Sequence, residues 1–516
     1  MSSALAMRGA ADMTGAAQTT LASILGDRVP DAYKALSISG LCLDSRKICF
    51  GDAFVALHGE AHNGLDYVRE AKSAGAVAVF ADTDNLRIAE QCDLPLVAVP
   101  QLEDRLPGIA ARFYDHPARA LHIVGITGTN GKTSCAWLYA NWRARLQTSC
   151  GVIGTLGCGI ATSAATEFDE TGLTTPDAIA LQRCLAKLRD EGCEQVAMEV
   201  SSHALAQDRV AGVNFESAIF TNLSRDHLDY HHDMQSYADT KRRLFEVAGL
   251  QRAAINVDDP AGRDLLTKLP RSLRVISYAL EDQNADVHVR DIHCSIDGIQ
   301  ATVVTPQGDG ELHCPLPGKF NLANLLAVLA VLLDEGLALP ALLDSAMSLP
   351  AVPGRMQRVA LLDKKAATPA FAVFIDYAHT PDALQNALLA IKPHAEGALR
   401  VVFGAGGDRD IGKRALMGAV AARLADQVIL TNDNPRSELP EKIVADIRAG
   451  MPPAAPVVVE LDRAAAIALA VDAANAGDVV LVAGKGHELF QQEGDRRRPF
   501  SDYAIAQAAL QARCAA

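Results

Sequence analysis

The sequence predicts an α/β protein of three domains: a small N-terminal α/β domain, a central domain with a mostly parallel sheet of the P-loop ATPase type, and a C-terminal Rossmann-like α/β domain. Three observations support this prediction. The chain has 516 residues, and domains average roughly 150 residues. Short apolar segments alternate with stretches at helical spacing. A Gly-rich loop follows an apolar segment near residue 128, and a Pro/Gly-rich break lies near residue 350.

The first domain is expected over residues 18–117, after a flexible tail over residues 1–17 that is rich in Ala, Met, Ser and Gly. Short apolar runs, which predict strands, alternate here with a stretch at helical spacing over 65–74. The runs cover residues 53–57, 76–80 and 96–99. Asp115-His116-Pro117 marks the end of this domain.

The central domain is expected over residues 118–353. A β-branched strand over 121–127 enters the Gly-rich loop, and a helix over 134–146 follows. Three further strands alternate with helical segments, which favours a parallel, doubly wound sheet. These strands are predicted over 195–200, 217–221 and 253–257.

A third domain is expected over residues 354–516, after the break at 349–354. It again combines buried strands with helical stretches, as in dinucleotide-binding folds. The strands are predicted over 371–376, 399–403, 427–431 and 479–483.

Composition excludes some functions. Lys and Arg total 48 against 62 Asp and Glu, a net charge of −14, so sequence-independent binding to nucleic acid or anionic membrane is disfavoured. The longest apolar run, 325–333, is far shorter than the about 20 residues that cross a bilayer. No export signal is recognisable in the first 20 residues. The eleven cysteines lack a C-x-x-C pair, which argues against a structural zinc site. We therefore expect a cytoplasmic protein without a transmembrane segment.

The loop G-I-T-G-T-N-G-K-T, residues 125–133, is a variant phosphate-binding loop. Backbone amides and a helix N-terminus there suit a polyphosphate. Lys132 would reach the β- and γ-phosphates, and the hydroxyl of Thr133 would ligate Mg²⁺. The strict pattern fails because Ile126 stands where the first glycine is required, so an ordinary Gly-rich turn is the alternative.

Possible metal ligands follow two later strands. Glu199 ends the strand at 195–200, and His227 follows the strand at 217–221. Ligands bind at the carboxyl ends of strands in open α/β sheets, and Mg²⁺ prefers oxygen donors such as Glu199. Singly, such residues are also typical of caps and solvated loops. Together with the phosphate loop, they favour a site for ATP and Mg²⁺.

Ordered motifs from about residue 20 to 510 connect the chain to a known family. They are D-S-R at 44–46, G-T-N-G-K-T-S at 128–134, T-T-P-D at 174–177, M-E-V-S-S-H-A-L at 198–205, N-L-S-R-D-H-L-D-Y-H at 222–231, G-K-F-N at 318–321, D-Y-A-H-T-P-D at 376–382, D-N-P-R at 433–436 and G-K-G-H-E at 484–488. With these motifs the chain resembles the Mur ligases, the ATP-dependent amide-bond-forming enzymes of bacterial cell-wall synthesis.

The resemblance implies a reaction. ATP would convert the D-glutamyl side carboxylate of UDP-N-acetylmuramoyl-L-alanyl-D-glutamate into an acyl phosphate, which an amine attacks through a tetrahedral intermediate. In the family, D-N-P-R marks the members that add meso-diaminopimelate. An Arg at 436 can pair with the distal carboxylate that distinguishes this amino acid from lysine. We expect a monomer that binds no nucleic acid.

The resemblance also implies a role for individual residues. The catalytic residues would be Lys132, Glu199, His227 and Lys241, the last as a carbamylated lysine, and the metal ligands Thr133, Glu199, His227 and Lys241. ATP would be bound by Gly128, Thr129, Asn130, Gly131, Lys132, Thr133, Ser134, Asn321, Arg355, Asp376 and His379. The UDP-muramoyl dipeptide would be bound by Ser45, Arg46, Thr174, Thr175, Ser201, Gln207 and Arg209. Diaminopimelate would be bound by Arg409, Asp433, Asn434, Arg436, Gly484 and Glu488.

Alternatives remain at this point. Related enzymes, a lysine-adding ligase or a folylpolyglutamate synthase, share much of the pattern, but D-N-P-R and D-S-R argue against both. A P-loop ATPase that hydrolyses ATP without ligation and a scaffold that binds the precursor without catalysis belong to other classes. Strict dependence of ATP turnover on both other substrates would separate the ligase from both.

Overall fold

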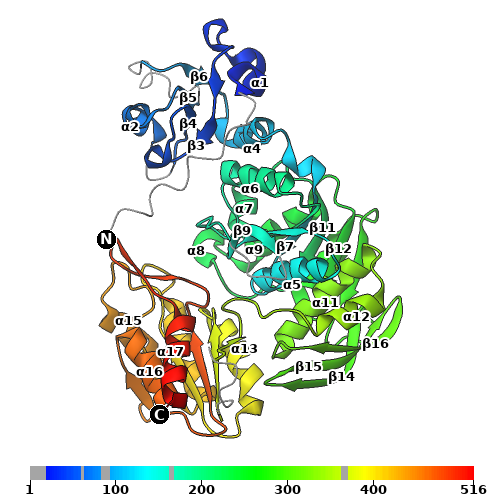
Figure 1. The fold of residues 1–516 in the computed structure, drawn as a ribbon, viewed down its shortest axis with the longest axis vertical. Helices are drawn as coiled ribbons and strands as arrows, with labels where there is room; N and C mark the ends of the chain where they lie inside the picture. The colour runs from blue at the N-terminus through cyan, green and yellow to red at the C-terminus, as the bar shows by residue number, and fades with distance from the viewer. Residues whose placement is uncertain (1–18, 60–62, 83–92, 162–167, 362–369, 516) are drawn as a thin grey trace. The chain divides into compact units, whose positions relative to one another are not determined.

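The computed structural model describes residues 19–59, 63–82, 93–161, 168–361 and 370–515. Two compact units are present (Figure 1). The first comprises Met1–His122, Thr175–Gly192 and His203–Asn214, and the second comprises Ile123–Thr174, Cys193–Ser202 and Phe215–Ala516. The predicted tail, 1–17, lies outside the described residues, and the boundaries at 117 and 353 stay a prediction.

The first unit is built on a parallel sheet with the strand order β3-β4-β5-β6. The strands are β3 (Gly40–Cys42), β4 (Asp52–Ala56), β5 (Ala78–Ala81) and β6 (Leu96–Ala98). Alternate side chains of each strand point to opposite faces, and both faces are covered. Helices α1 (Leu21–Leu25), α4 (Leu102–Phe113) and α6 (Ala178–Asp190) share one apolar core with the sheet. Helix α2 (Val68–Ala74) contributes to the core on the other face. The small α/β domain predicted here is confirmed.

The second unit contains a seven-stranded sheet with the order β13-β12-β11-β7-β10-β8-β9. The strands are β7 (His122–Thr127), β8 (Cys150–Gly154), β9 (Gly157–Ala161), β10 (Gln195–Glu199), β11 (Phe215–Phe220), β12 (Arg252–Asn256) and β13 (Arg274–Tyr278). All neighbours with a described register are parallel except β8 and β9. The predicted strands lie within two residues of β7, β10, β11 and β12.

Two long helices pack together beside this sheet, α5 (Lys132–Arg145) and α11 (Lys319–Asp334). The apolar run at 325–333 lies inside α11, where every one of its side chains is buried. Its hydrophobicity therefore serves the protein core. Among the described residues, no helix is both long enough and apolar enough to cross a membrane.

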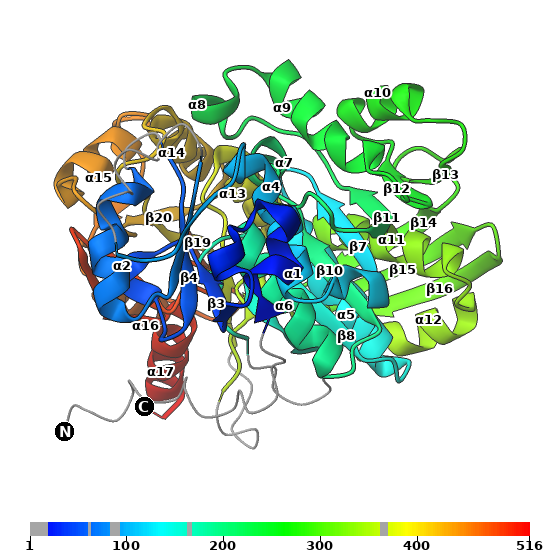
Figure 2. The same cartoon turned by 90° about the horizontal axis from the view of Figure 1, so that it is seen from above.

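The sequence predicted a mostly parallel sheet up to residue 350, and this prediction is wrong for residues 288–314. They form an antiparallel sheet of β14 (His288–Ser295), β15 (Gly298–Thr305) and β16 (Gly308–Cys314), beside helix α12 (Leu339–Ala346) (Figure 2). The signal was present, because apolar residues alternate along β15, and each later strand begins with a glycine, Gly298 or Gly308, directly after a two-residue turn.

The third sheet has the order β17-β18-β22-β19-β20-β21. The strands are β17 (Gln357–Arg358), β18 (Ala372–Asp376), β19 (Leu399–Phe403), β20 (Gln427–Leu430), β21 (Val457–Val459) and β22 (Val479–Ala483). All pairs are parallel except β17–β18. The four predicted strands are confirmed, with their ends shifted by one residue at most.

Helices cover both faces of this third sheet, as expected of a Rossmann-like fold. Helices α13 (Pro381–Ile391), α14 (Gly412–Leu424) and α15 (Pro440–Arg448) pack on one face. Helices α16 (Arg463–Asp472) and α17 (Asp502–Ala515) pack side by side on the other (Figure 1). A hairpin of β23 (Phe490–Glu493) and β24 (Arg496–Pro499) follows β22 and was not predicted.

The remaining helices of the second unit are short. They are α7 (Ser202–Ala206), which continues into the first unit, α8 (Leu228–His231), α9 (Met234–Arg242) and α10 (Pro260–Lys268).

Candidate active site

The phosphate loop joins β7 to α5, as predicted. Gly128 and Gly131 both have positive φ, 149° and 90°, and Gly131 precedes the first helical residue, Lys132. A side chain at Gly128 would collide with that of Thr221, so a glycine is required there. Because no side chain caps α5, its first amides remain available for an anion.

The start of the N-L-S-R motif holds this loop in place. Thr221 Oγ1 donates to the Asn130 carbonyl oxygen at 2.6 Å. The Asn130 amide donates to Asn222 Oδ1 at 2.9 Å, and the Thr129 amide donates to the Asn222 carbonyl oxygen at 2.9 Å. Thr221 and Asn222 follow β11, and the phosphate loop follows β7, the neighbour of β11 in the sheet. Parallel pairing of the two strands therefore brings these two segments together.

Glu199 lies beside the phosphate loop at the end of β10. Its side chain is buried, and its Oε2 accepts a hydrogen bond from Thr133 Oγ1 at 2.9 Å. Thr155, which sequence reasoning missed, donates its amide to Glu199 Oε1 at 2.7 Å and its hydroxyl to Oε2 at 3.1 Å. Thr155 also contacts the hydroxyl of Thr174 at 3.2 Å. The predicted ligands Thr133 and Glu199 are therefore brought together.

Two lysines, the half-buried Lys132 and the fully buried Lys241, converge on one carbonyl oxygen of the loop. Lys132 Nζ donates to the carbonyls of Gly128 and Thr129, both at 2.8 Å. Lys241 Nζ, from α9, donates to the same Gly128 carbonyl at 2.9 Å. Burial lowers the pKa of Lys132, and burial together with the positive charge of Lys132 lowers the pKa of Lys241 well below its ordinary value.

Tyr237 is a second residue that the sequence did not reveal. Its hydroxyl lies 3.3 Å from Thr129 Oγ1, and its ring lies under the ammonium of Lys241, with Nζ 4.5 Å from the centroid. The ring of His231 stacks on Tyr237 at 5.0 Å, and its Nε2 lies 2.9 Å from Ser202 Oγ. Tyr237 therefore fixes Lys241 against the loop.

His227 occupies the turn before α8 with a φ of 53°. Its Nε2 lies 3.4 Å from Asp226 Oδ2, and its side chain is 45% exposed, so it is accessible to a ligand. Although burial alone would raise the pKa of Asp226, the nearby charges of His227, His379 and Lys413 keep it below its ordinary value. Lys413, from α14, was not predicted as a site residue.

Arg355 and His379 come from the start of the third sheet region. Arg355 Nη2 donates to Thr133 Oγ1 at 3.3 Å, and its guanidinium lies 4.1 Å from the centroid of the Tyr377 ring. The Nδ1 of His379 donates to the Tyr377 carbonyl at 2.9 Å. Burial lowers the pKa of His379 to about 4, so the ring is neutral at physiological pH.

Two predicted nucleotide-binding residues, Asp376 and Asn321, form hydrogen bonds within the protein. Asp376 accepts hydrogen bonds from the amides of Met356 at 2.7 Å and Ala378 at 2.8 Å. Asn321 donates to the Pro317 carbonyl at 2.8 Å, while its buried Oδ1 has no hydrogen-bond partner among the described residues. Asp376 thus fastens the segment that carries Arg355, and Asn321 retains an unused acceptor.

The predicted residues for the UDP-muramoyl dipeptide lie partly in the first unit. Ser45 follows β3 and donates to Glu70 Oε2 at 2.9 Å, whereas Arg46 is exposed and forms a fork with Asp44. Arg209 donates to Gln207 Oε1 and, at 3.1 Å, to the Thr175 carbonyl. Ser201 follows β10 in the second unit.

The D-N-P-R segment lies after β20. Arg436 has a φ of 51°, and its backbone pairs with the β23–β24 hairpin through Gln492 and Gly494. Its Nη1 donates to the Gly407 carbonyl at 2.6 Å. A Cβ built on Gly406 would lie 2.9 Å from Arg436 Nη1 and 3.8 Å from Arg409 Cγ. The two predicted arginines therefore flank one glycine.

Lys485 connects the other predicted residues of this region. It is fully buried, and its Nζ donates to Glu488 Oε2 at 2.7 Å and to Asn434 Oδ1 at 3.1 Å. Asn434 Nδ2 in turn donates to Glu488 Oε2 at 2.9 Å. Gly484, with a φ of 115°, lies close to the carboxylate of Asp433.

A buried ion pair lies next to the D-N-P-R and G-K-G-H-E motifs. Arg463 and Asp502 are fully buried and paired at 2.7 Å. The same guanidinium donates to the carbonyls of Asn432 at 3.1 Å and Ala483 at 2.9 Å, which immediately precede D-N-P-R and G-K-G-H-E. Arg463 therefore sets the spacing between the two motifs.

The donors beside the phosphate loop fit Mg²⁺. Thr133 and Glu199 offer a hydroxyl and a carboxylate, the oxygen ligands that this ion prefers. No three His, Cys, Asp or Glu side chains form a metal-binding group within the part of the chain that the structure describes. In nucleotide sites Mg²⁺ is commonly bound by one or two protein oxygens and by substrate phosphates.

Family models match in the same order as the domains. The Mur ligase family, catalytic domain, matches residues 37–114; the Mur ligase middle domain matches 126–332; and the Mur ligase, glutamate ligase domain matches 354–486. The matched ranges include residues 126–133 of the phosphate loop, Glu199, Lys241 and D-N-P-R.

Individual relatives agree over nearly the full length. The UDP-N-acetylmuramoyl-L-alanyl-D-glutamate–2,6-diaminopimelate ligase of Alkalilimnicola ehrlichii is 47% identical over 91% of this chain and 94% of its own. The ligase of the same name from Pseudomonas aeruginosa is 45% identical over 95% and 98%.

Solved structures share the fold. A structure of a ligase with that name has a TM-score of 0.65 at 35% identity, over 96% of this chain and 99% of that one. The MurF ligase of Thermotoga maritima in complex with ADP has a TM-score of 0.64 over 92% and 98%; at 18% identity it supports the fold alone. With three matching domain models and these relatives, the chain belongs to the Mur ligase family.

Proposed function

We propose that this chain is an ATP-dependent, ADP-forming ligase that joins meso-diaminopimelate to UDP-N-acetylmuramoyl-L-alanyl-D-glutamate in peptidoglycan precursor synthesis. Relatives carrying the name of this ligase are 45–47% identical over more than nine-tenths of the chain. One observation supports the proposal most strongly. A single unit holds both the phosphate loop, where Thr133 donates to Glu199, and the D-N-P-R segment, where Asn434 donates to Glu488.

The first step requires two anions to meet, the glutamyl carboxylate and the γ-phosphate. No protein nucleophile is needed, so the protein must position both groups and neutralise charge. We assign the phosphates to the loop amides, to Lys132 and to Arg355, which reaches Thr133. ATP supplies the phosphoryl group, and Mg²⁺, held by Thr133 and Glu199, would offset the negative charge.

Lys241 is proposed as a carbamylated residue and, with His227, as a further metal ligand. A buried amine beside a second ammonium is biased towards its neutral form, which is the form that reacts with CO₂. Carbamylation would replace a positive group by a negative one next to Lys132, relieving the like-charge contact at Gly128. Intact-mass measurement under native and acidic conditions tests for a labile gain of one CO₂.

The amine site is assigned to the D-N-P-R and G-K-G-H-E loops. Arg436 and Arg409, on either side of Gly406, would bind the distal carboxylate of diaminopimelate, and Glu488 would bind its distal ammonium. The remaining proposed contacts are Asp433, Asn434 and Gly484. Lysine lacks the distal carboxylate and would leave the arginines without their anion.

Ser45 and Arg46 of the first unit, together with Thr174, Thr175, Ser201, Gln207 and Arg209, are proposed to bind the UDP-muramoyl dipeptide. Nucleotide-linked precursors and ATP are cytoplasmic metabolites, so we place the reaction in the cytoplasm, which cell fractionation can test. We also propose that the ligase acts as a monomer, and sedimentation tests this.

Phosphate release measured with ATP, Mg²⁺ and UDP-muramoyl-alanyl-glutamate tests the activity. We expect turnover with meso-diaminopimelate and little with L-lysine or with no amino acid. Turnover with lysine would overturn the assignment of Arg436 while keeping the ligase. Release that is indifferent to all three conditions would indicate a plain ATPase.

A further inference from the structure

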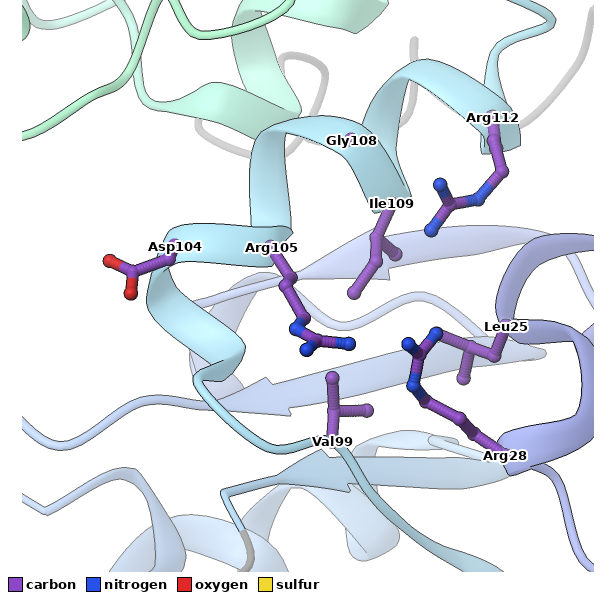
Figure 3. Close-up of a pocket in the computed structure, with 8 residues that line it drawn as sticks. All are labelled: Leu25, Arg28, Val99, Asp104, Arg105, Gly108, Ile109 and Arg112. Carbon is purple, nitrogen blue, oxygen red and sulfur yellow. The ribbon is translucent and has the colours of Figure 1, made fainter.

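A cavity of about 250 Å³ lies in the first unit, between the end of α1 and helix α4 (Figure 3). Its apolar part is formed by Leu25, Val99 and Ile109. Its polar part includes Asp104 and three arginines that were not among the predicted site residues. The arginines are Arg28, Arg105 and Arg112.

Two separate elements bring the arginines together. Arg105 and Arg112 are seven residues apart on α4, which is two turns and places them on one face. Arg28 ends the 3₁₀ helix Gly26–Arg28, which follows α1. Figure 3 shows all three side chains directed towards the same space, whereas Asp104 points away from it.

The three arginines of this cluster have no acidic partner at ion-pair distance among the residues that the structure describes. Arg112 Nε donates to the Ile24 carbonyl at 2.5 Å, which fixes its orientation at the end of α1. Among the ion pairs of the described residues, none involves Arg28, Arg105 or Arg112. Partial desolvation and the positive charge of Arg28 both lower the pKa of Arg112, although the side chains of Arg28 and Arg112 are exposed. Three like charges around one cavity, in a chain of net charge −14, suit an anionic ligand.

The cavity is distinct from Ser45 and Arg46, two of the proposed UDP-binding residues of the same unit. Ser45 and Arg46 follow β3, which is one edge strand of the sheet, whereas Val99 follows β6, the opposite edge strand. The sheet therefore separates the two groups by its full width.

We propose that Arg28, Arg105 and Arg112 form a second anion site, which binds the phosphate group of a small phosphorylated metabolite. Planar guanidiniums match phosphate oxygens with paired N–H donors. The volume admits a phosphate with a short carbon skeleton, and Leu25, Val99 and Ile109 would contact that skeleton. The site goes beyond the ligation reaction and does not depend on it.

Arginine footprinting on the full-length protein tests this site residue by residue. Phenylglyoxal reacts with accessible guanidiniums, and peptide mass spectrometry reports each rate separately. With inorganic phosphate as the probe and chloride at equal ionic strength as the control, we expect modification of Arg28 and Arg105 to slow about fivefold or more. The exposed Arg69 on α2 serves as the internal reference. Equal slowing at Arg69, or no slowing at Arg28, would overturn the proposal.

A matched pair of variants adds a second readout. Arg105→Gln should abolish the protection of Arg28 by phosphate, because the two guanidiniums would share one ligand. Arg69→Gln should leave that protection unchanged. Persistence of Arg28 protection in Arg105→Gln would also contradict a shared site. Because the readout is local, phosphate binding at the nucleotide loop does not contribute to it.

Discussion

Replacing Lys485 by Met should weaken binding of the amino-acid substrate much more than binding of ATP. The substitution keeps the length of the chain but removes the ammonium that joins Glu488 at 2.7 Å and Asn434 at 3.1 Å. Breaking one partner of a buried ion pair costs about 3–5 kcal/mol. Because the Glu488 side chain is 22% exposed, water can hydrate the unpaired carboxylate and offset part of this cost. We therefore expect a net cost of about 2–3 kcal/mol.

That free energy corresponds to a rise of about 30- to 150-fold in KM for meso-diaminopimelate. The KM for ATP should change less than about threefold, because Lys485 touches no proposed phosphate contact. Phosphate release measured against each substrate in turn gives both constants. The exposed Lys442 on α15 provides the control, and Lys442→Met should change neither. A similar rise in both constants of Lys485→Met would refute a role for Lys485 in positioning Asn434 and Glu488.

Four other outcomes are expected. Arg436→Ala should raise KM for diaminopimelate by about 2–5 kcal/mol in equivalent free energy while leaving KM for ATP nearly unchanged, and equal effects in a steady-state assay would contradict the assignment. Lys132→Ala should abolish ligation but not folding, as activity and thermal unfolding compared side by side will show. Removing Mg²⁺ with EDTA should stop phosphate release, and added Mg²⁺ should restore it; activity that survives chelation would exclude the metal. Hydrogen bonding to the Arg414 guanidinium lowers the pKa of Glu438 to about 2. The ionised Glu438 carboxylate therefore stabilises the folded protein fully above the ordinary carboxyl pKa, and this stabilisation disappears as pH falls from about 4.5 towards 2. Glu438→Gln should therefore lose less stability than the parent protein over that range, by on the order of 1–2 kcal/mol, and identical pH profiles of thermal unfolding would argue against this.

The sequence by itself determined the features that depend on local pattern. The loop at 125–133, the strands predicted over 195–200 and 217–221, and the turn of D-N-P-R all follow from short-range signals: β-branched runs, glycine spacing and proline. Parallel pairing then brings the carboxyl ends of neighbouring strands together. For this reason the sequence alone predicts that Thr133 and Glu199 lie near each other.

Only the tertiary structure decided which distant residues support these motifs. Tyr237 reaches Thr129 of the phosphate loop from α9, Lys485 reaches Asn434 from the segment after β22, and Arg463 of α16 donates to the carbonyls that precede D-N-P-R and G-K-G-H-E. The antiparallel strands β14–β16 carried a hairpin signal, yet a periodic pattern does not say which strands will pair. The same holds for the arginine cavity, where Arg28 meets Arg105 only because α4 packs against the end of α1. Local spacing specifies the direction of a side chain along its own element, whereas its partners depend on how the buried faces of separate elements pack together.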